Sequence, residues 1–274
     1  MKVRPLAPAM GAEAIGIDLS APLEDAIIAE LRNVWLEHQM IVIRGQDLTP
    51  AQQLAFAKAI GEPDIYPFLT GLEGFPMITE VLKKENETVN FGGVWHSDTT
   101  YQTCPPMATL LYAKDLPPLG GDTLFANQYE AFAQLSAPLR RVLEGLRAIN
   151  AAGKKRVAAT RSERLKDADS GVNPDNLSGI HPVVRTHPET GRKALFVNVA
   201  HTVAFEGWSD EESRGLLEYL FEHQISPEFQ CRLEWRLGDV AFWDNRCVQH
   251  YPLNDYQGYR RLLHRITLKG DIPK

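Results

Sequence analysis

The stretch richest in information about the fold reads Val240-Ala241-Phe242-Trp243-Asp244-Asn245-Arg246-Cys247-Val248-Gln249-His250. Its first residues, Val240–Trp243, have the bulky apolar side chains of a short buried strand, and a polar turn follows them. From Met77 onward, seven further segments have the same form: Ile78–Leu82, Ala108–Tyr112, Thr123–Ala126, Pro182–Thr186, Ala194–Asn198, Gln230–Leu233 and Arg261–Leu268. Strands at such intervals favour a sandwich or barrel over a parallel βαβ sheet.

Helices are expected around this β-rich part of the chain. Apolar spacing predicts a helix over Pro22–Met40. The capping residues Thr49 and Gln52 predict a second helix that starts after Thr49 and runs to about Ile60. Two later helices are predicted, over Gln128–Leu146 with a break at Pro138 and from Ser209 to His223. No repeat or linker divides the chain. We therefore expect one domain over residues 1–274, mainly β with α (α+β).

One long polar segment, residues 150–179, lacks clear periodicity. Irregular segments of this length inside a compact domain usually have a function or are mobile. We expect a mobile lid over the active site, and the basic run from Lys154 to Arg164 could attract an anion to it.

Composition excludes several classes of protein. The chain has 274 residues, 44% hydrophobic and 23% charged, which is typical of a folded globular protein. Its 29 basic and 35 acidic residues give a net charge of −6, and the basic residues are dispersed, so nucleic acid is not an expected partner. Three cysteines at wide spacing indicate free thiols in a reducing compartment. With no signal-like or membrane-spanning apolar run, we expect a cytoplasmic protein without membrane contact.

Three residues form a candidate metal site. In Trp95-His96-Ser97-Asp98-Thr99, an extended backbone would place His96 and Asp98 on one face. His250, after the strand quoted first, could supply the third ligand. Two histidines and one carboxylate are the facial triad of non-haem Fe(II) oxygenases, whereas structural zinc sites need a fourth protein ligand.

Two arginines follow the third ligand. Arg261 and Arg265 are four residues apart on a predicted strand, so they share a face and could point into one cavity. Buried guanidinium groups need anions, and a small carboxylate or sulfonate binds them bidentately. The sequence therefore predicts an anion-binding cavity beside the metal.

Five separated blocks carry a family resemblance: Trp95-His96-Ser97-Asp98, Gly120-Gly121-Asp122-Thr123, His181 to Pro188, Trp243-Asp244-Asn245-Arg246 with Gln249-His250, and Arg260 to Arg265. Together they resemble the TauD/TfdA (taurine dioxygenase-like) family of Fe(II)- and 2-oxoglutarate-dependent dioxygenases, over nearly the whole chain. The resemblance implies a double-stranded β-helix (jelly-roll, cupin-like) core with flanking helices, and a homo-oligomer. It also implies that the reaction consumes O2 and 2-oxoglutarate, yields succinate and CO2, and hydroxylates a carbon of a small organic anion.

The resemblance also implies individual roles. His96, Asp98 and His250 would bind iron, and Arg261 and Thr123 would bind the distal carboxylate of 2-oxoglutarate. Arg265 matches the arginine that binds the anionic group of the substrate.

Three positions depart from the taurine pattern: Tyr66 replaces a histidine, Gly92 an asparagine and His201 a phenylalanine. We expect these three residues in the substrate pocket. The departures favour an alkylsulfonate, alkyl sulfate or aryloxyalkanoate over taurine, with release of sulfite, sulfate, or an alcohol or phenol.

Other readings of these residues stay open at this stage. Arg265 could pair with a surface acid, Thr123 could be an ordinary strand residue, and Tyr66 could be a core aromatic. His181 and His187 could be structural or exposed. A jelly-roll metalloenzyme of another class, an isomerase or hydrolase without 2-oxoglutarate, is one alternative function, and a metal-free binding module is another.

Overall fold

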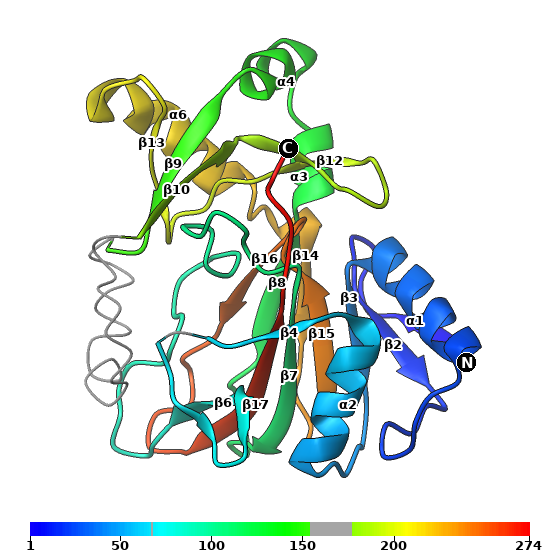
Figure 1. The fold of residues 1–274 in the computed structure, drawn as a ribbon. Coiled ribbons are helices and arrows are strands. Elements are labelled where there is room, and N and C mark those ends of the chain that lie inside the picture. Colours follow the sequence, from blue (N-terminus) through cyan, green and yellow to red (C-terminus); the bar gives the residue numbers. More distant parts are fainter. Residues whose placement is uncertain (67, 154–176) are drawn as a thin grey trace.

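The computed structural model describes residues 1–66, 68–153 and 177–274 (Figure 1). Within these ranges the chain is mainly β-sheet with some helices, as the sequence predicted. Nine of the described strands form a large sheet, in the order β1-β2-β3-β15-β7-β17-β6-β5 with β4 paired to β17. Its strands are β1 (Lys2–Pro5), β2 (Ala12–Ile15), β3 (Met40–Ile43), β4 (Pro63–Asp64), β5 (Gly71–Leu72), β6 (Phe75–Lys83), β7 (Ala108–Asp115), β15 (Val240–Asp244) and β17 (Arg261–Leu268).

The other described strands form smaller sheets. One has the order β14-β8-β16, another β10-β9-β13, and β11 pairs with β12. These strands are β8 (Thr123–Asn127), β9 (Arg147–Ala151), β10 (Ser178–Pro182), β11 (Val184–Thr186), β12 (Lys193–Leu195), β13 (Thr202–Phe205), β14 (Gln230–Leu233) and β16 (Val248–Pro252).

The central strands of the large sheet are buried on both faces, as the alternation of side chains in β3 shows. In β3, Ile41 and Ile43 pack in one hydrophobic cluster with Trp35 of the first helix, whereas Met40 and Val42 pack in another. That second cluster also contains Phe125 of β8, so the β14-β8-β16 sheet covers the inner face. Successive side chains of a strand point to opposite faces, and a strand buried on both faces is therefore apolar throughout. The candidate site lies between these two sheets.

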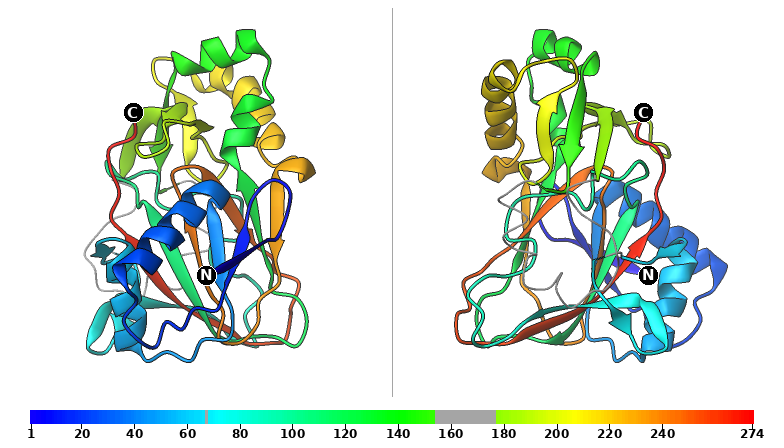
Figure 2. Two further views of the ribbon diagram at one scale, coloured as in Figure 1. Left: turned by 90° about the vertical axis from the view of Figure 1, so that its right-hand side faces the viewer. Right: turned by 60° about the vertical axis from the view of Figure 1, so that its left-hand side comes forward.

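Two helices cover the outer face of the large sheet, α1 (Asp25–His38) and α2 (Pro50–Ile60) (Figure 2). The sequence predicted both, the first a few residues too long at each end. α1 ends because Gln39 adopts a left-handed conformation with φ of 60°. α2 begins at the predicted capping box, in which Thr49 and Gln52 bond each other's backbone.

The remaining described helices are α3 (Gln128–Ala133), α4 (Ala137–Glu144), α6 (Asp210–His223) and the 3-10 turn η2 (Pro227–Phe229). They pack with β9 and β13 beyond the end of the two facing sheets (Figure 1). The break predicted at Pro138 was misplaced: Ser136 caps α4, and Pro138 lies in its first turn, where a missing N–H costs little. The capping box predicted at Ser209 is present at the start of α6.

Two predicted strands are wrong in part. Pro182–Thr186 is divided at Val183, where β10 leaves one sheet and β11 enters another. The backbone of Val183 bonds instead to Leu146 and Phe196. Of the segment Ala194–Asn198, only Ala194 and Leu195 lie in a strand. His250, which the sequence places after the strand Val240–Trp243 and its polar turn, lies in a further strand that was not predicted, β16.

The predicted lid at 150–179 lies mostly outside the described residues, because 154–176, including the basic run, are not among them. Its described ends belong to β9 and β10. Among the helices that the structure describes, none combines the length and the apolar character that crossing a membrane requires.

Candidate metal and anion site

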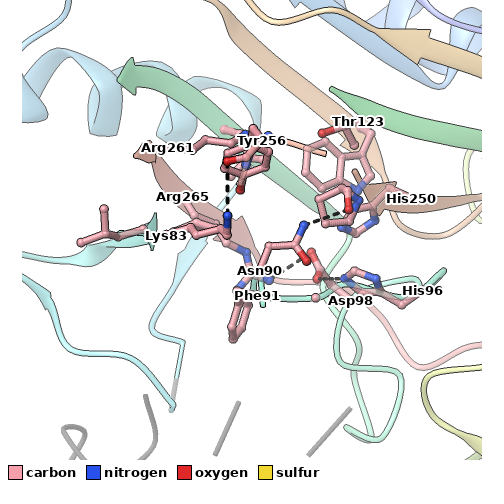
Figure 3. Close-up of a pocket in the computed structure, with 16 residues that line it drawn as sticks. Lys83, Asn90, Phe91, His96, Asp98, Thr123, His250, Tyr256, Arg261 and Arg265 are labelled. Carbon is pink, nitrogen blue, oxygen red and sulfur yellow. Dashed lines mark hydrogen bonds and ion pairs between the residues drawn. The ribbon is translucent and has the colours of Figure 1, made fainter. Parts of the chain in front are cut away.

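The three predicted metal ligands come together. Each of His96, Asp98 and His250 offers a donor atom, and these atoms all lie within 4.8 Å of one another in a buried position (Figure 3). His96 and His250 reach each other through a two-way backbone bridge, with N···O distances of 3.1 and 2.8 Å. Asp98 lies in the turn that follows and not on a regular strand, contrary to the geometry we expected. The donor set, two imidazoles and one carboxylate, suits a divalent transition metal.

The electrostatics of the site keep the ligands in metal-binding forms. Burial alone would raise the pKa of Asp98, but Arg265, 3.0 Å from Oδ2, and the two histidines hold it well below its ordinary value. Burial and then the neighbouring His96 lower the pKa of His250 well below its ordinary value. At neutral pH this arrangement gives an ionised carboxylate and a neutral imidazole, the forms that bind metals.

A chain of hydrogen bonds orients Asp98. The indole N–H of Trp243 donates to Oδ1 of Asn245 at 3.0 Å, which leaves the amide Nδ2 of Asn245 to donate to Oγ1 of Thr109 at 2.9 Å. The Thr109 hydroxyl, having accepted that bond, donates its own proton to Oδ2 of Asp98. Oδ1 of Asp98 therefore faces His96, 3.6 Å away, and is the oxygen left for a metal.

Sequence reasoning missed Thr109 and Asn245. A signal existed for Thr109, because it is the one polar residue in the apolar run Ala108–Tyr112. A lone hydroxyl in a strand buried on both faces needs a partner.

Replacing Thr109 with valine is expected to weaken metal binding about 10-fold, because outer hydrogen-bond partners of ligands typically contribute 10- to 100-fold. Titration of Mn(II) by calorimetry measures the affinity. Thr109→Ser keeps the hydroxyl and should restore most of the binding. Equal affinities in wild type and Thr109→Val would rule out the orienting role.

Not every residue of the recognised blocks reaches the cavity. Asp244 is buried and accepts two bonds from the guanidinium of Arg246, at 2.8 and 2.7 Å, and one from His187 at 2.9 Å. His187, Asp244 and Cys247 together resemble a second ligand group, but Arg246 already occupies both carboxylate oxygens. His181 is also buried and bonds the carbonyl of Gln102. Both histidines are thus structural and neither is exposed.

Arg261 and Thr123 lie in the same cavity as the ligands, which encloses about 560 Å³ of space, part of it open to solvent. Arg261 is buried, and its Nε and Nη2 have no hydrogen-bond partner among the described residues. Gly121 allows this approach, since a Cβ there would lie 3.2 Å from Arg261 Cδ. Thr123 Oγ1 accepts from the Trp235 indole at 3.0 Å, so the hydroxyl proton remains for a cavity ligand. These orphaned donors fit a carboxylate.

Tyr66, Gly92 and His201 line a second cavity, which adjoins the first at His96 and Asp98 and encloses about 350 Å³. Phe91, Val94 and Tyr101 share its wall. Gly92 has φ of +72°, and a Cβ there would lie 3.0 Å from the His96 ring, so the cavity has no side chain at this position. The three predicted pocket residues are therefore neighbours.

The partner of Arg265 in the structure is not the surface acid that the sequence left open. Arg265 lines the first cavity and pairs with the buried Asp98, so the surface acid considered above is wrong. Its guanidinium also lies 4.5 Å over the ring of Tyr66. Tyr66 packs edge-on against Phe68 and Phe91, which makes it a wall aromatic of the second cavity. Arg265 thus lines the first cavity and contacts Tyr66 in the wall of the second.

Comparison with known proteins agrees with this picture. Residues 2–267 match the family model of the taurine catabolism dioxygenase TauD, TfdA family. The alpha-ketoglutarate-dependent sulfate ester dioxygenase of Pseudomonas putida is 33% identical over 100% of this chain and 91% of its own. The alpha-ketoglutarate-dependent 2,4-dichlorophenoxyacetate dioxygenase of Cupriavidus pinatubonensis is 33% identical, with 97% of each chain covered.

Solved structures are similar as well. A taurine dioxygenase from Burkholderia xenovorans superposes with a TM-score of 0.84 at 36% identity, covering 99% of this chain and 92% of that one. The structure of AAD-2 in complex with Mn(II) and N-oxalylglycine superposes with a TM-score of 0.82 at 26% identity, with 99% of each chain covered.

The sheet-rich fold and a buried group of two histidines and one carboxylate define a metal-dependent oxygenase. The chain belongs to the TauD/TfdA family of dioxygenases. This membership confirms the predicted enzyme class and favours it over the isomerase, the hydrolase and the metal-free binding module.

Proposed function

We propose that the protein hydroxylates a carbon of a small organic anion in a reaction that consumes 2-oxoglutarate and O2. The observation that carries this proposal is the buried Arg261, whose unpaired donors point into the cavity that holds the three converging ligands. A hydrolase or isomerase has no need of a second anion-binding group there, whereas a dicarboxylate co-substrate does.

The predicted cofactors, Fe(II), 2-oxoglutarate (alpha-ketoglutarate) and O2, are confirmed by the family and by relatives named for their dependence on alpha-ketoglutarate. When bound, they supply the oxidation: 2-oxoglutarate becomes succinate and CO2, and one oxygen atom is inserted into a C–H bond. We assign His96, Asp98 and His250 to the metal and Arg261 with Thr123 to the distal carboxylate. These residues bind, orient and neutralise, and the buried cavity excludes water.

We also propose the finer fold description, one domain over residues 1–274 with a double-stranded β-helix core. The β14-β8-β16 sheet and the central strands of the large sheet face each other across a shared apolar cluster, which supports it. His250 comes from the small sheet, and Arg261 and Arg265 from the large one.

The second cavity supports a substrate with a larger apolar body than taurine. Its wall is mostly aromatic and aliphatic, and Arg265, which lines the adjoining first cavity, lies over the ring of Tyr66 and can meet an anionic group. We assign Tyr66, Gly92, His201 and Arg265 to the substrate. An alkylsulfonate, alkyl sulfate or aryloxyalkanoate fits these groups, and hydroxylation beside the sulfur or ether oxygen would release sulfite, sulfate, or an alcohol or phenol.

A substrate panel tests this proposal. With Fe(II), 2-oxoglutarate and O2, a medium-chain alkyl sulfate or an aryloxyalkanoate is expected to give kcat/KM at least about 10-fold above taurine, since each buried methylene contributes 1–3 kcal/mol. Succinate formation is measured, with the reaction lacking primary substrate as the control. Taurine as the best substrate of the panel would overturn the pocket assignment.

We further propose a cytoplasmic homo-oligomer without nucleic acid or membrane partners. The location is supported by the three cysteines, of which none forms a disulfide and Cys231 and Cys247 are buried. The oligomer rests on the family resemblance alone.

A further inference from the structure

Lys83 and Arg261 form a pair of buried cations in the first cavity. Lys83 is the last residue of β6 and Arg261 the first of β17, and the antiparallel register places them directly opposite each other. Residues in such positions have their side chains on the same face of the sheet. Both line the cavity (Figure 3), and Lys83 and Arg261 are only 2% and 3% exposed.

Such a pair is unfavourable unless an anion joins it. Like charges directly opposite on neighbouring strands destabilise a sheet, and buried charges require a counter-charge. Lys83 Nζ instead bonds neutral groups, the Tyr256 carbonyl at 3.5 Å and the Gln257 amide oxygen at 3.4 Å, and lies 4.2 Å from the Tyr256 ring. Burial accordingly lowers the pKa of Lys83.

The nearby acids are engaged elsewhere. Asp122 accepts a bond from Arg232, Asp255 accepts one from the backbone N–H of Gly121, and Glu87, whose charge acts on the pKa of Lys83, accepts one from the backbone N–H of Lys84. The described lining of the cavity therefore has Lys83, Arg261 and Arg265 against the single carboxylate of Asp98. Since Asp98 pairs with Arg265, no other carboxylate among the described lining residues is left for Lys83 and Arg261.

We propose that Lys83 is a second cationic residue for the distal carboxylate of 2-oxoglutarate, beside Arg261. This inference rests on the proposed function. Arg261 offers a planar fork that binds two oxygens, and Lys83 adds a compact charge from the facing strand. Together they select a 2-oxo acid with a second carboxylate over one without it.

The test measures ligand binding without turnover. Lys83→Met keeps the length of the side chain and removes its charge, and Lys84→Met, at the exposed next residue, is the matched control. With Mn(II) bound, calorimetry is expected to show N-oxalylglycine binding 10- to 100-fold more weakly in Lys83→Met, roughly the contribution of a charged hydrogen bond, and unchanged in Lys84→Met. The rise in Tm that N-oxalylglycine causes should shrink with it. Lys83→Arg should recover much of the affinity.

A second ligand, oxamate, distinguishes a role of Lys83 in binding the distal carboxylate from a purely structural role. Oxamate lacks the distal carboxylate of N-oxalylglycine, so its affinity is expected to be the same in Lys83→Met and wild type. Gln257→Ala removes a contact of Lys83 but leaves the charge, and should bind N-oxalylglycine normally.

Three results would overturn the inference: unchanged binding of N-oxalylglycine in Lys83→Met, equal weakening of both ligands, or the same loss in Gln257→Ala. Should Lys83→Met fail to fold, Lys83→Gln is read in its place. If wild type itself binds neither Mn(II) nor N-oxalylglycine, the proposed function fails, which is a different result.

Discussion

Asp98→Ala is expected to lose metal binding by more than about 100-fold, because the orienting partners of a ligand alone contribute 10- to 100-fold. The change removes the only carboxylate of the three ligands and leaves Arg265 buried without its partner. Loss of one member of a buried pair also costs about 3–5 kcal/mol of stability. Calorimetric titration with Mn(II), together with circular dichroism of the metal-free protein, measures both effects.

Asp98→Asn keeps the shape of the side chain and separates metal loss from misfolding. The matched control is Asp115→Asn, which removes the charge of a carboxylate that pairs with Arg260 away from the cavity, and it should bind Mn(II) normally. A folded Asp98→Asn protein with wild-type affinity for Mn(II) would remove Asp98 from the metal site.

Arg261→Met is expected to raise the KM for 2-oxoglutarate about 100-fold or more, since charged hydrogen bonds contribute about 1.5–3 kcal/mol each. kcat at saturating 2-oxoglutarate should change much less, because the group binds a part of the co-substrate that does not react. Steady-state kinetics with varied 2-oxoglutarate separates the two constants.

The control for this second variant is Arg260→Met, at the neighbouring residue, whose guanidinium is exposed and pairs with Asp115. Its KM should match that of wild type. If Arg261→Met had the same KM for 2-oxoglutarate as wild type, the distal carboxylate would have to bind other residues.

The pattern of the sequence predicted the central strands and most helices because these depend on local alternation and capping. β14 and β17 have the expected bounds, and the capping boxes at Thr49 and Ser209 are present. The break at Val183 was not predictable in this way. It depends on backbone hydrogen bonds between Val183 and two residues outside its own segment, Leu146 and Phe196.

The ligands and the two arginines were predictable because motif order and the two-residue period of a strand place them together. Which residues these side chains pair with could not be predicted from the sequence. Thr109 lies only 11 residues after Asp98, but its bond to that carboxylate depends on how β7 approaches the turn. The pairing of Arg265 with Asp98 requires β17, far along the chain, to approach the same turn. The predicted strand Ile78–Leu82 ends before Lys83, whereas in the structure Lys83 is buried and the register with β17 places it opposite Arg261.

The central claim is that the three ligands hold Fe(II) and that 2-oxoglutarate binds beside it. Anaerobic addition of Fe(II) and 2-oxoglutarate to the purified protein tests it most directly, read as a visible metal-to-ligand charge-transfer band. We expect a band that requires both additions and disappears in Asp98→Ala. No band in the wild-type protein, or an unchanged band in Asp98→Ala, would contradict the account.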